Sequence, residues 1–309
     1  MAHQRTIHRP VHAIGVGVHS GKNARLTLRP APAGHGVQFV RKDLSSGPIR
    51  AWVTHVTDTL LSTSIAVNGA QISTVEHLMS ALWGLGIDNL KIELRGEEVP
   101  ILDGSAAPFV GLLESAGVVT LDAPKQFIRI KRTIRVAQGD AVAILRPYPG
   151  FRASYTFVAD HPVYNRYPKQ ASIDFASVSY VDAVSRARSF GLVDELPQAH
   201  AIRKCLGSSL ENAVGVTDEG ILNPEGLRYE DEFVKHKILD AIGDLYLLGK
   251  PIIGEFDGYK SGHALNNQLA RTLLRCPDAW DVVTAADDNA LVRAGVASLD
   301  EAIAGAAGR

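Results

Sequence analysis

An imidazole and two carboxylates follow one another at intervals of four residues, as His236, Asp240 and Asp244. At about 100° per residue, these three side chains share one face of a helix. Residues four apart are neighbours on a helix surface, so His236 and Asp240 can hold one Zn²⁺ from the same side. Gly243 leaves this polar face open, and Lys237 places a cation at its border. Taken alone, the spacing favours the alternative, a solvated helix face.

A second stretch, residues 73–84, places a glutamate beside a histidine. Apolar residues recur there at helical intervals, which predicts a helix over about 74–83. His77 would add a metal ligand, and Glu76 would take a proton from metal-bound water. Ser73 and Glu76 also have the spacing of a capping box, in which the Glu76 carboxylate accepts from the backbone N–H of Ser73. Without further evidence, capping is the favoured role of Glu76.

A third stretch centres on His263, which follows a glycine at the start of a predicted helix over 264–274. A strand-like run over 251–256 comes before it, and Lys260 lies between the two. Side chains at turns on a rigid scaffold often carry function. A capping or turn histidine is an equal alternative.

Together these three stretches resemble the UDP-3-O-acyl-N-acetylglucosamine deacetylases, zinc enzymes of lipid A biosynthesis in Gram-negative bacteria. Each motif is weak alone, but the set is specific because the motifs follow the family's order from about residue 4 to about residue 285. The matching segments are STVEHL (73–78), HKILDAIGD (236–244), KSGHALNN (260–267), GVGVHSG (15–21), ILDGSAAPF (101–109), SRARSFG (185–191) and GLRYEDEFV (226–234).

The resemblance implies a catalytic metal site. His77, His236 and Asp240 would hold one Zn²⁺ and leave a fourth position for a water of lowered pKa. Fe²⁺ is an alternative, since it occupies similar nitrogen and oxygen sites. Glu76 would be the general base as this water attacks an acetamide carbonyl.

The resemblance also implies a general acid and a hydrogen-bond donor that stabilises the oxyanion. His263 would protonate the amine leaving group, and Asp244 would hold it in its charged form. The hydroxyl of Ser189 would stabilise the oxyanion. The family usually has threonine at this position, so serine keeps the donor and loses the methyl group.

Substrate-binding roles follow from the same resemblance. Lys237 and Lys260 would bind the diphosphate of an acylated UDP-amino sugar, although either is equally a solvated surface lysine. Phe190 and the segment 192–216 would line a passage for the acyl chain, with Cys205 as an apolar wall residue. Two alternatives remain open: a zinc amidohydrolase for another N-acyl substrate, and a non-catalytic protein that binds lipid-linked sugars.

Strand and helix signals alternate along the chain, which predicts an α+β fold. A proline-bearing link at 122–125 suggests two domains, residues 1–124 and 125–309. The resemblance implies that both share one topology and sandwich their helices between two sheets. Further helices are predicted over 106–116 and 231–248, and alternating polarity predicts strands over 25–28, 37–40, 91–94, 127–131 and 141–145.

Composition excludes several classes of protein. The 309 residues carry a net charge of −1, so the chain has no overall positive charge that would attract nucleic acid. The two cysteines form no CxxC motif, and no run of about 18 apolar residues could span a membrane. The N-terminus lacks the apolar core of a signal peptide. We therefore expect a cytoplasmic monomer, which an acylated substrate would bring near the inner membrane surface; its tail, 302–309, is expected to be mobile.

Overall fold

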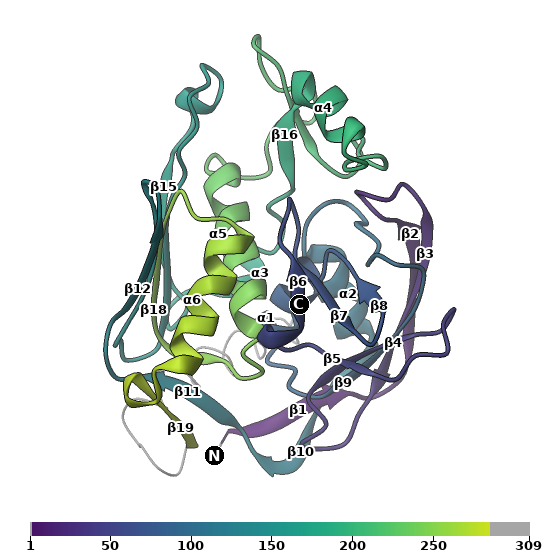
Figure 1. The fold of residues 1–309 in the computed structure, drawn as a ribbon, viewed down its shortest axis with the longest axis vertical. Helices are drawn as coiled ribbons and strands as arrows, with labels where there is room; N and C mark the ends of the chain where they lie inside the picture. Colours follow the sequence, from purple (N-terminus) through teal and green to yellow (C-terminus); the bar gives the residue numbers. More distant parts are fainter. Residues whose placement is uncertain (1, 285–309) are drawn as a thin grey trace.

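The computed structural model describes residues 2–284 of the chain. Two mixed sheets lie on opposite sides of a central layer of helices (Figure 1). This arrangement confirms the predicted α+β class and the predicted sandwich. The predicted mobile tail lies outside the described residues.

The first sheet and its helices come from the N-terminal half of the chain. The sheet has the order β2-β3-β9-β4-β5, and all neighbours are antiparallel except β4 and β9. Its elements are β2 (Val11–Val16), β3 (Asn23–Pro30), β4 (Val37–Arg41), β5 (Ile49–Arg50), α1 (Glu76–Gly84), β9 (Leu90–Arg95) and α2 (Ala107–Ala116).

The second half repeats this plan. Strands pair in the order β12-β13-β18-β14-β15, and again only one pair, β14 with β18, is parallel. Both halves therefore run β-β-β-β-α-β-α, which confirms the shared topology despite the absence of a sequence repeat. The elements are β12 (Ile134–Gln138), β13 (Ala141–Arg146), β14 (Phe151–Thr156), β15 (Gln170–Asp174), α5 (Glu232–Tyr246), β18 (Ile252–Tyr259) and α6 (His263–Arg275).

Each half also carries an insertion between its fourth strand and its first helix. In the first half it forms a small sheet of β6 (Val56–Asp58), β7 (Ser64–Val67) and β8 (Ala70–Ile72). In the second half it includes β16 and α4, which project beyond the helix layer (Figure 1). The elements of this second insertion are α3 (Tyr180–Ala183), β16 (Phe190–Leu192), α4 (Leu196–Ala201) and β17 (Val214–Val216).

Four further strands complete the sheets. β11 (Gln126–Ile130) and β19 (Trp280–Thr284) extend the second sheet beside the start of β18, and β1 (His3–Ile7) pairs with β10 (Val118–Pro124). Each described sheet thus draws its strands from one side of residue 125, while the domain boundary at 124 stays a prediction. The predicted helices and strands all occur, with ends displaced by up to three residues. No helix within residues 2–284 is long and apolar enough to cross a membrane.

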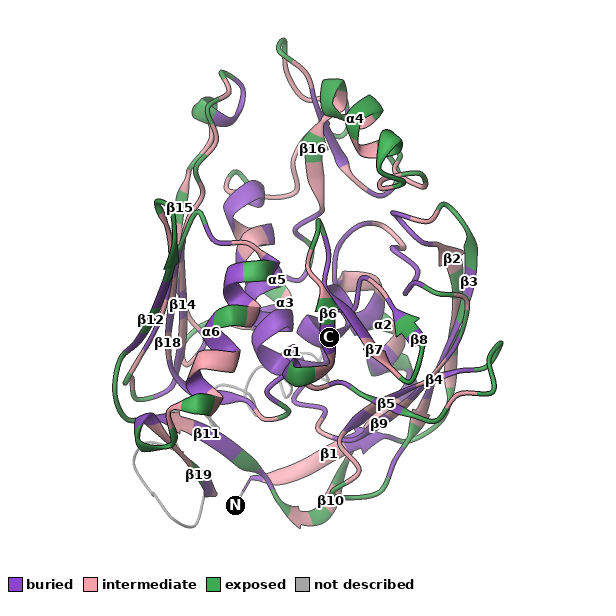
Figure 2. Cartoon of the chain, in the orientation of Figure 1, coloured by how far each residue is buried: buried purple, intermediate pink, exposed green. Residues whose placement is uncertain are grey.

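The helices α1 and α5 form the centre of the molecule (Figure 2). Every residue of α1 is buried, and α5 leaves only Lys235 and Lys237 partly exposed. The open polar face that we expected beside Gly243 is wrong, because α1 packs directly against α5 at this glycine. The imidazole and carboxylates of α5 therefore face a neighbouring helix inside the protein, where charged groups need partners.

Candidate metal centre and catalytic cluster

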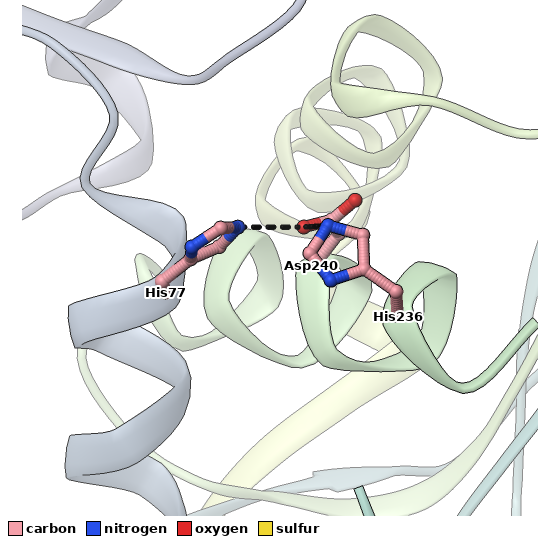
Figure 3. A group of neighbouring side chains, drawn as sticks. All are labelled: His77, His236 and Asp240. Carbon is pink, nitrogen blue, oxygen red and sulfur yellow. Dashed lines mark ion pairs between the residues drawn. The ribbon is translucent and has the colours of Figure 1, made fainter. Parts of the chain in front are cut away.

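The three predicted metal ligands lie together at the contact between α1 and α5. His77 comes from α1, and His236 and Asp240 lie one turn apart on α5 (Figure 3). Their ligand atoms all lie within 4.8 Å of one another. The Nε2 atoms of His77 and His236 are 3.4 Å and 3.5 Å from the same oxygen, Oδ1 of Asp240. Two helices distant in sequence thus present two nitrogens and one oxygen to a common point.

The donor set fits a zinc ion. Nδ1 of His236 donates to the carbonyl oxygen of Ala187 at 3.0 Å, which leaves the lone pair of Nε2 for a metal. Burial lowers the pKa of His236 to about 4, although Asp240 opposes this, so the ring is neutral at pH 7 as a ligand must be. Burial would raise the pKa of Asp240, but His236 and Lys237 hold it well below its ordinary value. Two imidazoles and a carboxylate are a common ligand set of catalytic zinc.

Glu76 points into this cluster and does not cap its own helix. Its Oε2 accepts from the backbone N–H of Thr63 at 3.0 Å, whereas the N–H of Ser73 donates to the carbonyl oxygen of Glu97. The capping-box interpretation is therefore wrong. Oε1 of Glu76 lies 3.8 Å from Nε2 of His263. Burial raises the pKa of the Glu76 carboxyl above its ordinary value.

His263 and Asp244 form a hydrogen-bonded pair on the other side of Glu76. Oδ2 of Asp244 accepts from Nδ1 of His263 and from Nδ2 of Asn266, each at 2.9 Å, and Oδ1 accepts from Oγ1 of Thr63 at 2.6 Å. Burial would lower the pKa of His263, but Asp244 and Glu76 raise it to about 9. The imidazole is therefore cationic at neutral pH, with Nε2–H on the side of Glu76.

Ser189 and Phe190 follow the carbonyl that orients His236. The Phe190 ring lies 5.9 Å from that of His236 between centroids. The Ser189 hydroxyl is half-buried and donates to the carbonyl oxygen of Gly104 at 3.2 Å. Phe190 is thus placed beside His236, and the Ser189 hydroxyl is turned toward Gly104.

The two predicted substrate-binding lysines differ in position. Nζ of Lys237 lies 2.7 Å from Oδ2 of Asp240, and its side chain is 19% exposed, so it borders both the cluster and solvent. Lys260 is exposed and pairs with Asp140 at 2.8 Å, in the turn between β12 and β13. Lys237 therefore joins the cluster, whereas the ion pair of Lys260 lies at the protein surface.

Several residues that support the cluster were missed by sequence reasoning. Thr63 lies outside every motif noted in the sequence, and Asn266 and the Ala187 carbonyl lie within motifs but were given no role. A buried ion pair was missed as well: Nε of Arg188 donates to Oε1 of Glu232 at 2.9 Å. Glu232 lies one turn before His236, so this pair fastens the segment 187–189 to α5. The arginine stands in the motif SRARSFG, where a buried position could have been suspected.

The second insertion is anchored beside the cluster. Nδ1 of His19, which follows β2, accepts from the backbone N–H of Cys205 at 3.3 Å. Burial raises the pKa of the Cys205 thiol, which keeps it protonated and unreactive.

Comparison with known proteins places this arrangement in a family. The sequence profile of the family UDP-3-O-acyl N-acetylglycosamine deacetylase matches residues 4–275. The chain belongs to this family. Two UDP-3-O-acyl-N-acetylglucosamine deacetylases match it over 93% of its length and 95% of their own: one from Hahella chejuensis with 53% identity over 288 residues, and one from Marinobacter nauticus with 52% over 289. The buried cluster thus lies in a chain that aligns with these deacetylases over nearly the whole length of both proteins.

Proposed function

We propose that this protein hydrolyses the acetamide of UDP-3-O-(3-hydroxyacyl)-N-acetylglucosamine, giving acetate and a free amine in lipid A biosynthesis, with zinc as its metal. The observation that carries this proposal is one buried cluster in which a nitrogen–nitrogen–oxygen ligand set adjoins Glu76 and a cationic His263. Amide hydrolysis needs an activated water, charge stabilisation at the carbonyl oxygen and a proton for the leaving amine. The cluster contains a group for each.

Bound by His77, His236 and Asp240, zinc would polarise the acetamide carbonyl and lower the pKa of the attacking water. Glu76 accepts the proton of that water on its carboxylate. Asp244 occupies Nδ1 of His263, so Nε2 is the atom that donates a proton to the amine nitrogen as the C–N bond breaks.

Ser189 and the cation His263 stabilise the negative charge that develops on the carbonyl oxygen. The Ser189 hydroxyl must turn from the Gly104 carbonyl to do so. Water screens the attraction between charges less inside a protein than at its surface. The buried cation of His263 therefore contributes more to this stabilisation than a surface group would.

The protein offers cations for the diphosphate end of the substrate and apolar side chains for its acyl end. Lys237 supplies a fixed cation beside the cluster for the diphosphate, and Lys260 supplies a second at the surface. Phe190 borders the metal ligands, and the insertion behind it exposes the apolar side chains Ile202, Leu206 and Leu210. Exposed apolar groups of this kind suit an acyl chain. A cytoplasmic location and a monomeric state stay predictions.

Acetate release tests the proposal. Purified protein would be stripped of metal and given back one equivalent of Zn²⁺ or Fe²⁺, with the acylated substrate and with UDP-N-acetylglucosamine as the control without an acyl chain. We expect activity that disappears, returns with metal and requires the acyl chain. Equal activity on both sugars would favour an amidohydrolase of another specificity, and inactivity of folded, metal-loaded protein would favour a non-catalytic binding protein.

A further inference from the structure

Thr63 contacts two carboxylates of the proposed mechanism, that of the general base Glu76 and that of Asp244, which holds His263. It lies in the loop between β6 and β7 and is 1% exposed. Its backbone N–H donates to Oε2 of Glu76 at 3.0 Å, and its hydroxyl donates to Oδ1 of Asp244 at 2.6 Å. A single residue from outside the two catalytic helices thus connects the carboxylate on α1 with the carboxylate on α5.

We infer that Thr63 is a positioning residue that sets the geometry of the base and of the histidine–aspartate pair together. The inference rests on the proposed roles of Glu76 and His263. A carboxylate held at one oxygen presents the other in a fixed direction. The bond at Oε2 therefore directs Oε1 of Glu76 toward the reaction side, and the bond at Oδ1 directs Oδ2 of Asp244 toward His263.

The loop is well placed for this role because it is fastened to α1. The carbonyl oxygen of Thr63 accepts from the N–H of Val75, the residue just before Glu76, at 3.2 Å. The hydroxyl of Ser64 donates to that of Ser73 at 2.9 Å. The segment 63–64 is therefore fixed to the start of α1, and the Thr63 hydroxyl links this segment to Asp244.

The hydroxyl is the part of Thr63 that can be tested by itself. Thr63→Val keeps the shape and the N–H bond to Glu76 but removes the donor to Asp244. Asp244 would keep its bonds at Oδ2 and lose the bond at Oδ1 that prevents its rotation. Hydrogen bonds to charged groups contribute enough to change a rate by about 10-fold or more when they are lost.

The experiment compares Thr63→Val with Thr63→Ser, which retains the hydroxyl. We expect Thr63→Val to lower kcat by about 10-fold or more, with KM within about twofold and bound zinc unchanged. Thr63→Ser should recover most of kcat. The matched control is Thr6→Val. Thr6 lies in β1 and is also buried, and its hydroxyl accepts a hydrogen bond from the backbone N–H of Ala31 at 3.0 Å. This control should leave kcat unchanged.

Unchanged kcat in Thr63→Val would overturn the inference, and so would equal losses in the valine and serine variants, since these would indicate packing alone. If the valine variant fails to fold, Thr63→Ala lacks the same hydroxyl and takes its place. Glu76→Gln separates the two levels of the argument. An active Glu76→Gln enzyme would contradict the proposed mechanism, whereas an inactive one together with a fully active Thr63→Val enzyme would remove only the role of Thr63.

Discussion

A Cβ atom on Gly243 would lie 2.0 Å from the carbonyl oxygen of Glu76. The obstacle is helix backbone, which no rotamer change can move aside. The axes of α1 and α5 can therefore approach as they do only because residue 243 has no side chain. Glu76 and His77 on one helix, and His236 and Asp240 on the other, take their separations from this contact.

Gly243→Ala should push the two helices apart and lower kcat by about 100-fold, since displacements near 1 Å have effects of this size on catalysis. It should also lower the thermal unfolding midpoint. Gly111→Ala is the matched control: Gly111 lies in α2, is exposed, and a Cβ there meets nothing within 4 Å. That variant should gain about 0.5–1 kcal/mol of stability from helix propensity. Steady-state kinetics and thermal melts of both would decide, and a fully active Gly243→Ala enzyme would contradict the role of this contact.

The pH dependence of kcat should report His263. Its pKa is raised to about 9 by Asp244 and Glu76 against the effect of burial, so the catalytic proton is present below that pH and lost above it. Asp244→Asn removes the nearest charge, and the alkaline limb should then move down toward the ordinary value of about 6.5. Rate profiles of both enzymes would show the displacement. An alkaline limb at the same pH in both would assign it to another group.

His236→Ala should abolish stoichiometric zinc binding and, with it, activity, because two protein ligands hold catalytic zinc poorly. Metal analysis after gel filtration measures this directly. His12→Ala serves as control, since His12 is exposed on β2 and bonds only locally, to Thr27. A zinc-replete, active His236→Ala protein would remove His236 from the ligand set.

Lys237→Ala should raise KM for the nucleotide sugar by about 10-fold, because one charge-assisted contact to the diphosphate is lost. Lys235→Ala is a close control. It lies on the same helix, is 18% exposed against 19% for Lys237, and pairs with Asp231 away from the cluster. KM unchanged in both variants would return Lys237 to a structural role beside Asp240.

Glu232→Ala should destabilise the fold by about 3–5 kcal/mol, because it leaves the buried guanidinium of Arg188 without its main partner. The exposed pair of Lys22 and Glu97 offers the contrast, and Glu97→Ala should change stability by less than about 1 kcal/mol. Urea unfolding gives both values. Equal effects of the two substitutions would mean that the Arg188 pair contributes no more than a surface pair.

Local sequence patterns predicted much of this protein. Helical periodicity predicted α1, α2, α5 and α6 to within two residues at either end, and strand alternation found the central strands of both sheets. The four-residue interval between His236 and Asp240 was sufficient to place both side chains on one side of α5. Each of these features depends on residues close together in the chain, which is why the sequence contains them.

The tertiary structure decided what those residues face. The role of Glu76 was ambiguous in sequence because its competing partner, Ser73, is local, whereas its actual partner is the N–H of Thr63, 13 residues away. Thr63 in turn reaches Asp244 across 181 positions. The contact with Asp244 depends on the packing of α1 on α5 at Gly243, and no local sequence pattern predicts which helix will cover a polar face. The sequence therefore determined the elements and the types of groups they carry, and the packing of the helices determined which of those groups meet.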